Sequence, residues 1–218
     1  MVVGIAADEG EPRIVLSSFL ATAAAGDRLS LEPYHVAAEM ERDPHGGASA
    51  AAAAAVAEGR RRQDELAVAS LEDIVRKLRK AGAEPVVAAL LVNRAAWITD
   101  PLAYSLGWPD HRPVAEGLAV RDALRFAFGR LGVEVAEFDE KSLYELAPKE
   151  LRLGSADIGI RLKALGATVG RPWRKEQKLA CLAAWIAVAA RPSSQLPRGR
   201  GASSRALEGK GSRSKSPT

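Results

Sequence analysis

The sequence predicts an α/β domain over residues 1–190, with a mixed sheet and flanking helices, followed by a disordered basic tail over residues 191–218. Three observations lead to this prediction. Short apolar runs are bounded by Gly, Pro, Asp and Asn, which is typical of strands. Longer segments between them carry apolar residues at helical spacing. The tail consists largely of Pro, Gly, Ser and Arg, a composition that cannot offset the entropy lost on ordering.

The first part of the domain is expected to supply three strands. Apolar runs at residues 2–7 and 13–20 are separated by the turn-forming residues 8–12, which favours a strand, a turn and a strand. Residues 29–37 predict a third strand, because apolar and polar side chains alternate there. Pro33 cannot donate to a ladder, so this strand should lie at an edge or be bulged.

Helices and strands alternate in the second part. An alanine run at residues 50–55 favours a marginal helix, and residues 63–80 have the pattern of an amphipathic helix. Residues 86–92 are apolar throughout, which suits a central strand covered on both faces. A helix predicted at 114–131 and a strand at 133–138 complete a parallel βαβ unit.

Terminal helices are expected at residues 148–165 and 173–190, where Pro192 ends the second. In the complete sheet, we expect the strands at 2–7 and 86–92 to be neighbours.

Cysteine usage and hydropathy indicate the compartment. The single cysteine, Cys181, excludes an intramolecular disulfide and a cysteine-based zinc site, and its apolar surroundings predict a small buried side chain. The start of the chain lacks the charged leader of a secretory signal. The longest strongly apolar stretch, residues 179–190, is shorter than the roughly 20 residues that span a bilayer. We therefore expect a cytoplasmic protein with no membrane partner.

The positive charge of the chain is concentrated in its tail. Residues 191–218 contain seven cations and one anion, a charge of +6, so the total of +4 leaves −2 for residues 1–190. The high isoelectric point therefore belongs to the tail and not to the domain.

Several segments resemble the RuvC resolvase and YqgF branch of the ribonuclease H-like superfamily, whose order of strands and helices is the one predicted above. The segment Val86–Val92 resembles its central strand, and Val133–Phe138 its last strand. The residues Asp139-Glu140-Lys141-Ser142-Leu143 are similar to the Asp-Glu-Arg-Leu stretch that follows that strand in YqgF proteins. Lys175–Val188 is similar to the last helix, and Val2-Val3-Gly4-Ile5 to the first strand.

The resemblance implies a ribonuclease H-like fold and a nucleic-acid-associated protein, either a metal-dependent nuclease or a catalytically degenerate relative. Members of the branch place a metal-binding aspartate directly after the first-strand Gly-Ile, where this chain has Ala6. They place another near the start of the last helix, where this chain has Glu176-Gln177-Lys178. Whether the protein is an enzyme is therefore left open.

Two-metal hydrolysis of a phosphodiester requires several carboxylates around ions about 4 Å apart, and oxygen ligands suit Mg²⁺ or Mn²⁺. The catalytic candidates are Asp8, Asp139 and Glu140, and the metal-binding candidates are Asp8, Asp139 and Glu176. Asp8 lies two residues beyond Ala6, on the same face of a strand but about 6–7 Å along it. The alternative is that Asp8 lies in a solvated turn and that Asp139 and Glu140 cap the next helix.

Two clusters combine aromatic and polar residues. Asn93, Arg94 and Trp97 follow the carboxyl end of the strand at 86–92, where open α/β sheets bind ligands. In the functional interpretation Trp97 stacks on a ligand and Asn93 or Arg94 hydrogen-bonds to it. In the alternative, Trp97 and Trp108 pack the loop onto the sheet.

The second cluster, Trp173 and Arg174, has the residue types that stack on a base and contact a phosphate. Trp173 could equally be a buried residue at a helix start. Two hypotheses of function follow. The first is a nucleic-acid-associated protein, and the second is a non-enzymatic assembly protein that binds a protein partner through the loop at 93–111 and the tail.

Overall fold

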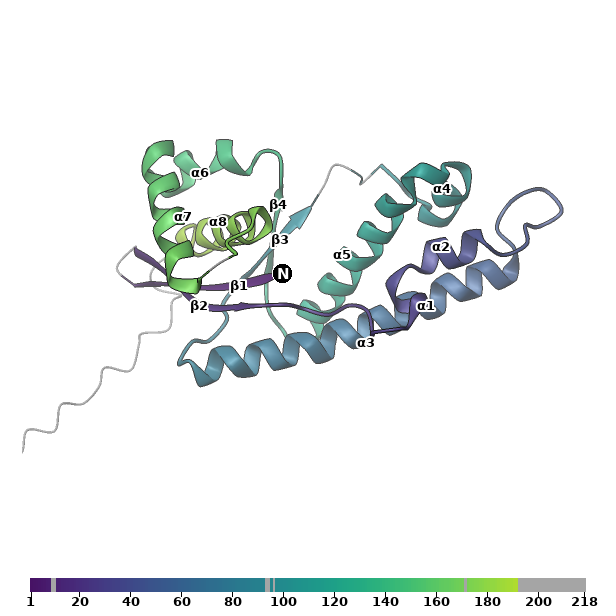
Figure 1. The fold of residues 1–218 in the computed structure, drawn as a ribbon, viewed down its shortest axis with the longest axis horizontal. Coiled ribbons are helices and arrows are strands. Elements are labelled where there is room, and N and C mark those ends of the chain that lie inside the picture. Colours follow the sequence, from purple (N-terminus) through teal and green to yellow (C-terminus); the bar gives the residue numbers. More distant parts are fainter. Residues whose placement is uncertain (9–10, 93–94, 96, 171, 192–218) are drawn as a thin grey trace, which may run out of the picture.

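A computed structural model describes residues 1–8, 11–92, 95, 97–170 and 172–191. The chain forms a mixed α/β structure in which the long helix α3 (Ala50–Lys80) runs along one side of the molecule (Figure 1). Helices α6–α8 gather around the strands at one end, and α1, α2 and α4 lie toward the other. The predicted tail, apart from Arg191, lies outside the described residues.

Strands β1 (Val2–Asp8) and β2 (Glu11–Ser18) form an antiparallel hairpin, which confirms the first two predicted strands. The register shifts between Gly4 and Ile5. At Gly4 the hairpin approaches α3 so closely that a Cβ atom would lie 2.8 Å from Leu78 Cδ2. The hairpin and α3 are therefore in close contact at Gly4.

Strands β3 (Ala88–Val92) and β4 (Val135–Asp139) pair in parallel, with Ala88 opposite Val135 and Val92 opposite Asp139. Helix α5 (Arg112–Arg130) connects them. The predicted parallel βαβ unit is confirmed, and it places Val92 and Asp139 side by side at the carboxyl end of the pair.

The predicted strand at residues 29–37 is wrong, because this segment forms the short helices α1 (Arg28–Leu31) and α2 (Pro33–Ala38). The Asp27 side chain accepts a hydrogen bond from the Leu29 N–H and so caps α1. Pro33 is the first residue of α2, a position where its missing N–H costs nothing. Pro33 therefore begins a helix and does not interrupt a strand.

The expectation that strands 2–7 and 86–92 are neighbours in one sheet is also wrong for the described residues, where β1 pairs with β2 and β3 pairs with β4. Helix α8 (Lys175–Ala189) packs against both β1 and β3, so the two pairs share one core without sharing a ladder. Without a third strand, each pair buries its apolar face against a helix.

The helix predicted at 148–165 is divided into α6 (Leu143–Leu151) and α7 (Ser155–Val169). Arg152, with φ 53°, has a left-handed conformation that ends α6. The predicted helices at 50–55 and 63–80 are one continuous helix, α3. The remaining elements are α4 (Pro101–Gly107) and a 3₁₀ turn, η1 (Pro109–His111).

The buried apolar residues of the described chain form three clusters. The first lies among α6, α7, α8 and the strands, and it contains Cys181. The second joins the C-terminal halves of α3 and α5, and the third joins their N-terminal halves to α2. Helix α5 contributes Ala115, Ala119, Ala123 and Ala127, four residues apart on one face, and these small side chains let it pack closely against α3.

Burial raises the pKa of the Cys181 thiol to about 12, which confirms the prediction of an inert apolar side chain. In the part of the chain that the structure describes, no helix is both long and apolar enough to cross a membrane.

Candidate functional site

A pocket of about 350 Å³ lies at the carboxyl end of β3, where a parallel α/β unit is expected to bind ligands. Its lining comes from α3, α5, the end of β3, β4 and the segment that connects β3 to α4. Five charged residues face it, namely Arg60, Arg121, Asp122, Arg125 and Glu137. We refer to it as the arginine pocket.

Four of these charges are paired with one another. Arg60 Nη2 lies 2.8 Å from Asp122 Oδ2, and Arg125 Nη1 lies 2.9 Å from Asp122 Oδ1. Arg125 Nε also lies 2.5 Å from Glu137 Oε1, and this contact holds the pKa of Glu137 below its usual value. The ion-pair network of these four residues therefore has no net charge.

Arg121 is the fifth charge, and no carboxylate among the described residues forms an ion pair with it. Its Nε donates to the Leu91 carbonyl at 3.2 Å, and its Nη1 donates to the Gly117 carbonyl at 2.9 Å. Burial and the like charge of Arg125 lower the pKa of Arg121, and the negative charge of the nearby Glu140 partly opposes this shift. Among the residues that line the arginine pocket, Arg121 is thus the one charge without an ion pair, and the backbone fixes its orientation.

Four rings form an exposed series beside the pocket, which we call the aromatic array (Trp97, Tyr104, Trp108 and His111). Ring centroids are 5.5 Å apart for Trp97 and Tyr104, 6.0 Å for Tyr104 and His111, and 6.2 Å for Trp108 and His111. Tyr104 Oη lies 3.0 Å from His111 Nδ1. Trp97 is 68% exposed and Trp108 is 61% exposed, so these rings face solvent and do not pack the segment onto the sheet.

Local structure holds the aromatic array in place. Asp100 caps α4, since its side chain accepts the Ala103 N–H at 2.9 Å, and Pro101 follows as the first helical residue. The Trp108 N–H donates to the Tyr104 carbonyl, and the His111 N–H donates to the Trp108 carbonyl. These hydrogen bonds hold Trp108, which lies between α4 and η1, next to His111 and Tyr104.

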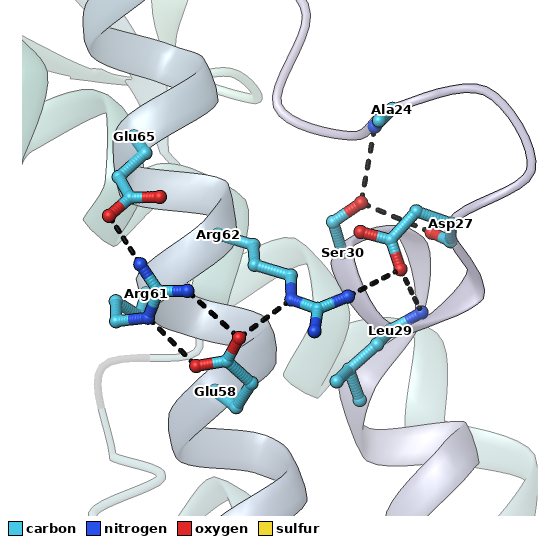
Figure 2. Close-up of polar contacts among 8 residues, drawn as sticks. All are labelled: Ala24, Asp27, Leu29, Ser30, Glu58, Arg61, Arg62 and Glu65. Carbon is cyan, nitrogen blue, oxygen red and sulfur yellow. Dashed lines mark hydrogen bonds and ion pairs between the residues drawn. The ribbon is translucent and has the colours of Figure 1, made fainter.

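Two other arginines of α3 are paired with carboxylates. Figure 2 shows Arg61 bound to Glu58 and Glu65, and Arg62 bound to Glu58 and Asp27. The two arginines lower the pKa of Glu58 to about 2. Because Asp27 also caps α1, this network attaches α1 to α3. These arginines are therefore already paired, unlike Arg121.

A larger surface groove, of about 770 Å³, lies between the end of α3 and the turn before β4. Its arginines are also paired, Arg76 with Asp73 at 3.1 Å and Arg79 with Glu84 at 2.7 Å. Among its lining residues, no arginine is held by backbone carbonyls without a carboxylate partner, and there is no exposed aromatic cluster. We therefore place the candidate site at the arginine pocket.

The predicted acidic residues near β4 have local partners. Asp139 Oδ1 accepts the Lys141 N–H at 2.9 Å, and Glu140 lies 3.6 Å from Lys175 Nζ. The Glu140 N–H also donates to the Val92 carbonyl, which brings Glu140 to the edge of the arginine pocket. Glu176 is exposed in the first turn of α8, where a negative charge favours the helix.

Asp8 lies at the far end of the β1–β2 hairpin from the start of α8. Its backbone pairs with Glu11, whereas Gln177 of α8 contacts Ser17, at 3.4 Å between Nε2 and Oγ. Glu11 and Ser17 are six positions apart along β2, a distance of about 20 Å. Among the described side chains, no group of three or more His, Cys, Asp or Glu residues is arranged to hold a metal ion. The Asp8 side chain is not among those described, so the divalent-metal site that the resemblance implies stays a prediction.

The cluster at Trp173 and Arg174 has a packing role in the structure. The Trp173 ring lies against α7 so closely that a Cβ atom at Gly166 would be 2.4 Å from its Cδ1. The Arg174 N–H donates to Gln177 Oε1 at 2.8 Å and so helps to start α8. Asn93 and Arg94 lie outside the described residues.

The sequence pattern indicated Trp97 as a candidate but not the three arginines of the pocket. Arg121 and Arg125 are four residues apart on α5, a spacing that places them on one helical face and that could have indicated a basic patch. Arg60 reaches the same pocket from α3, and no pattern in the sequence connects it to α5.

The chain was compared with known proteins in three ways. A scan against protein-family models, a search of curated proteins and a search of solved structures found no match.

Proposed function

We propose that this protein binds single-stranded nucleic acid, and that bases stack on the aromatic array. The exposure of Trp97 and Trp108, at 68% and 61%, carries this proposal. Both rings are held in contact with neighbouring rings and yet present large surfaces to solvent. Stacking of a base on such a ring contributes about 1–3 kcal/mol and tolerates any sequence, because every base has a π-face.

The surrounding charge supports nucleic acid over an uncharged ligand. Single-strand sites combine stacking rings with cations that follow the backbone, and the arginine pocket supplies such a cation next to the array. Arg191 is paired with Glu134, and the sequence adds six cations and one anion over residues 192–218, a charge of +5 that would strengthen binding through counterion release. The resemblance to the RuvC and YqgF branch agrees with a nucleic-acid ligand. The proposal concerns binding and not hydrolysis.

The test is the affinity of a fluorescently labelled, single-stranded oligonucleotide at low salt, measured by anisotropy. Trp97→Ala and Trp108→Ala should each weaken binding by about 5- to 150-fold, the equivalent of one lost stack. Tyr144→Ala is the matched control, because Tyr144 is an exposed aromatic residue of α6 outside the array. Circular dichroism establishes that each variant is folded.

Two results would overturn the proposal. The first is wild-type protein that does not bind the oligonucleotide at low salt. The second is a Trp97→Ala/Trp108→Ala double variant that binds it as tightly as the wild type. Exposed tryptophan and tyrosine are also common in protein interfaces, so either result would favour the assembly hypothesis, in which the aromatic array binds a protein partner.

A further inference from the structure

We infer that the arginine pocket is a phosphate-binding subsite in which Arg121 is the charged ligand. It takes a phosphate group of the strand whose bases stack on the aromatic array, so this part of the inference rests on the proposed function. Phosphate binding in the pocket can be tested without any nucleic acid, because a free phosphate has the same chemistry as a phosphate group of the strand.

The charges of the pocket favour an anion. Arg60, Asp122, Arg125 and Glu137 compensate one another through the ion pairs described above. Arg121 remains as an excess positive charge in a partly buried setting, with the like charge of Arg125 nearby. Glu140, at the edge of the pocket, offsets part of this charge without forming an ion pair with Arg121. An anion inside the pocket would contact the guanidinium directly.

The geometry of Arg121 suits a phosphate. Its Nε and Nη1 are fixed by the carbonyls of Leu91 and Gly117, so little side-chain entropy is lost when a ligand binds. Its Nη2 makes no hydrogen bond to a described residue, and a guanidinium donates well to phosphate oxygens. Thr99 lines the same pocket and is exposed, so its hydroxyl is a second donor.

The pocket and the aromatic array adjoin each other along the chain. Trp97 is bonded to Ile98, which lines the pocket together with Thr99 and Pro101. Pro101 in turn begins α4, the helix that carries Tyr104. At about 350 Å³ the pocket has room for a phosphate and part of the sugar attached to it. A base on Trp97 and a phosphate in the pocket can therefore belong to one strand.

The first experiment uses inorganic phosphate and the full-length protein. Millimolar phosphate should raise the melting temperature of the wild type more than chloride at equal ionic strength, because phosphate binds the folded state alone. Arg121→Gln should abolish this difference. Arg130→Gln, an exposed arginine at the end of the same helix, should retain it.

Thr99→Val provides a variant that leaves the helices untouched. It should weaken phosphate binding by about tenfold through the loss of one hydrogen bond to a charged group. Equal phosphate binding by the wild type, Arg121→Gln and Thr99→Val would overturn the inference. So would a wild type that phosphate stabilises no more than chloride does.

The second experiment connects the subsite to the strand. Arg121→Gln should lose one phosphate contact, so the slope of log affinity against log salt should become less steep by about 0.7. Arg130→Gln should leave this slope unchanged. If phosphate binding depends on Arg121 but the salt slope of Arg121→Gln is unchanged, the pocket binds a free phosphate. Only the proposed contact between the pocket and the nucleic-acid strand would then be overturned. Phosphate binding without any oligonucleotide binding would retain the subsite and refute the proposed function.

Discussion

Replacement of Gly59 by alanine tests how α3 is positioned for the candidate site. Gly59 precedes Arg60 and lies under α1 and α2, where a Cβ atom would be 2.5 Å from the Leu29 carbonyl oxygen and 2.6 Å from Pro33 Cβ. Both distances are shorter than any van der Waals contact, and one neighbour is backbone. Gly59→Ala therefore forces α1 and α2 away from α3.

The expected magnitude is a balance of two effects. Overpacking costs about 1–3 kcal/mol and occasionally more, and a backbone contact this close should reach the upper end of that range. Alanine in a helix recovers about 1 kcal/mol of propensity. We expect a net loss of about 2 kcal/mol, which lowers the melting temperature by about 4–8 °C in a chain of this size.

Gly159→Ala is the matched control, because Gly159 lies within α7 and nothing surrounds its Cβ position within 4 Å. It should raise the melting temperature by about 2–4 °C through helix propensity alone. Thermal unfolding followed by circular dichroism measures both variants. If Gly59→Ala were as stable as the wild type, the close packing of α1 and α2 on α3 would be wrong.

Three further predictions concern stability and binding. Since burial raises the pKa of Cys181 to about 12 and an unfolded thiol ionises near pH 9, stability should fall as pH rises from about 9 to 12, and Cys181→Ala should reduce this fall. Deletion of residues 192–218 should weaken oligonucleotide binding and flatten its salt dependence, because it removes six cations, and equal binding would show that the tail does not contribute. A chelator should leave oligonucleotide affinity unchanged, because stacking and the Arg121 contact need no metal; a loss of affinity would instead indicate a divalent-ion site.

Local pattern was sufficient to predict the βαβ unit. Residues 86–92 and 133–138 are short apolar segments on either side of a helix whose apolar residues repeat at helical spacing, so each element is determined by its own sequence. The parallel pairing of β3 and β4 follows from that order. The last helix and the burial of Cys181 were predictable for the same reason.

Tertiary contacts decided the elements that were mispredicted. Residues 29–37 alternate as a strand would, but Tyr34 and Ala37 lie three residues apart on α2 and are buried in the cluster that α2 forms with α3. The order of the strands depends on α8, which is far away in sequence and packs against both pairs. Neither contact has a local signature.

The candidate site was predictable only in part. The carboxyl end of a parallel strand is a known position for ligands, and the exposed ring of Trp97 lies beside it. The excess charge of Arg121 could not be predicted, because it depends on which arginines find carboxylate partners. Arg60 and Asp122, 62 residues apart, pair only in the folded chain.

Stacking of bases on Trp97 and Trp108 is the central claim, and quenching of tryptophan fluorescence by a single-stranded oligonucleotide tests it most directly. The other two tryptophans, Trp173 and Trp185, are packed against the helices of the first core cluster and should not respond. We predict that the oligonucleotide quenches the wild-type emission and that the Trp97→Phe/Trp108→Phe variant, which retains aromatic rings at both positions, loses this quenching while still binding. Equal quenching in the variant, or none in the wild type when binding is saturated, would contradict the account.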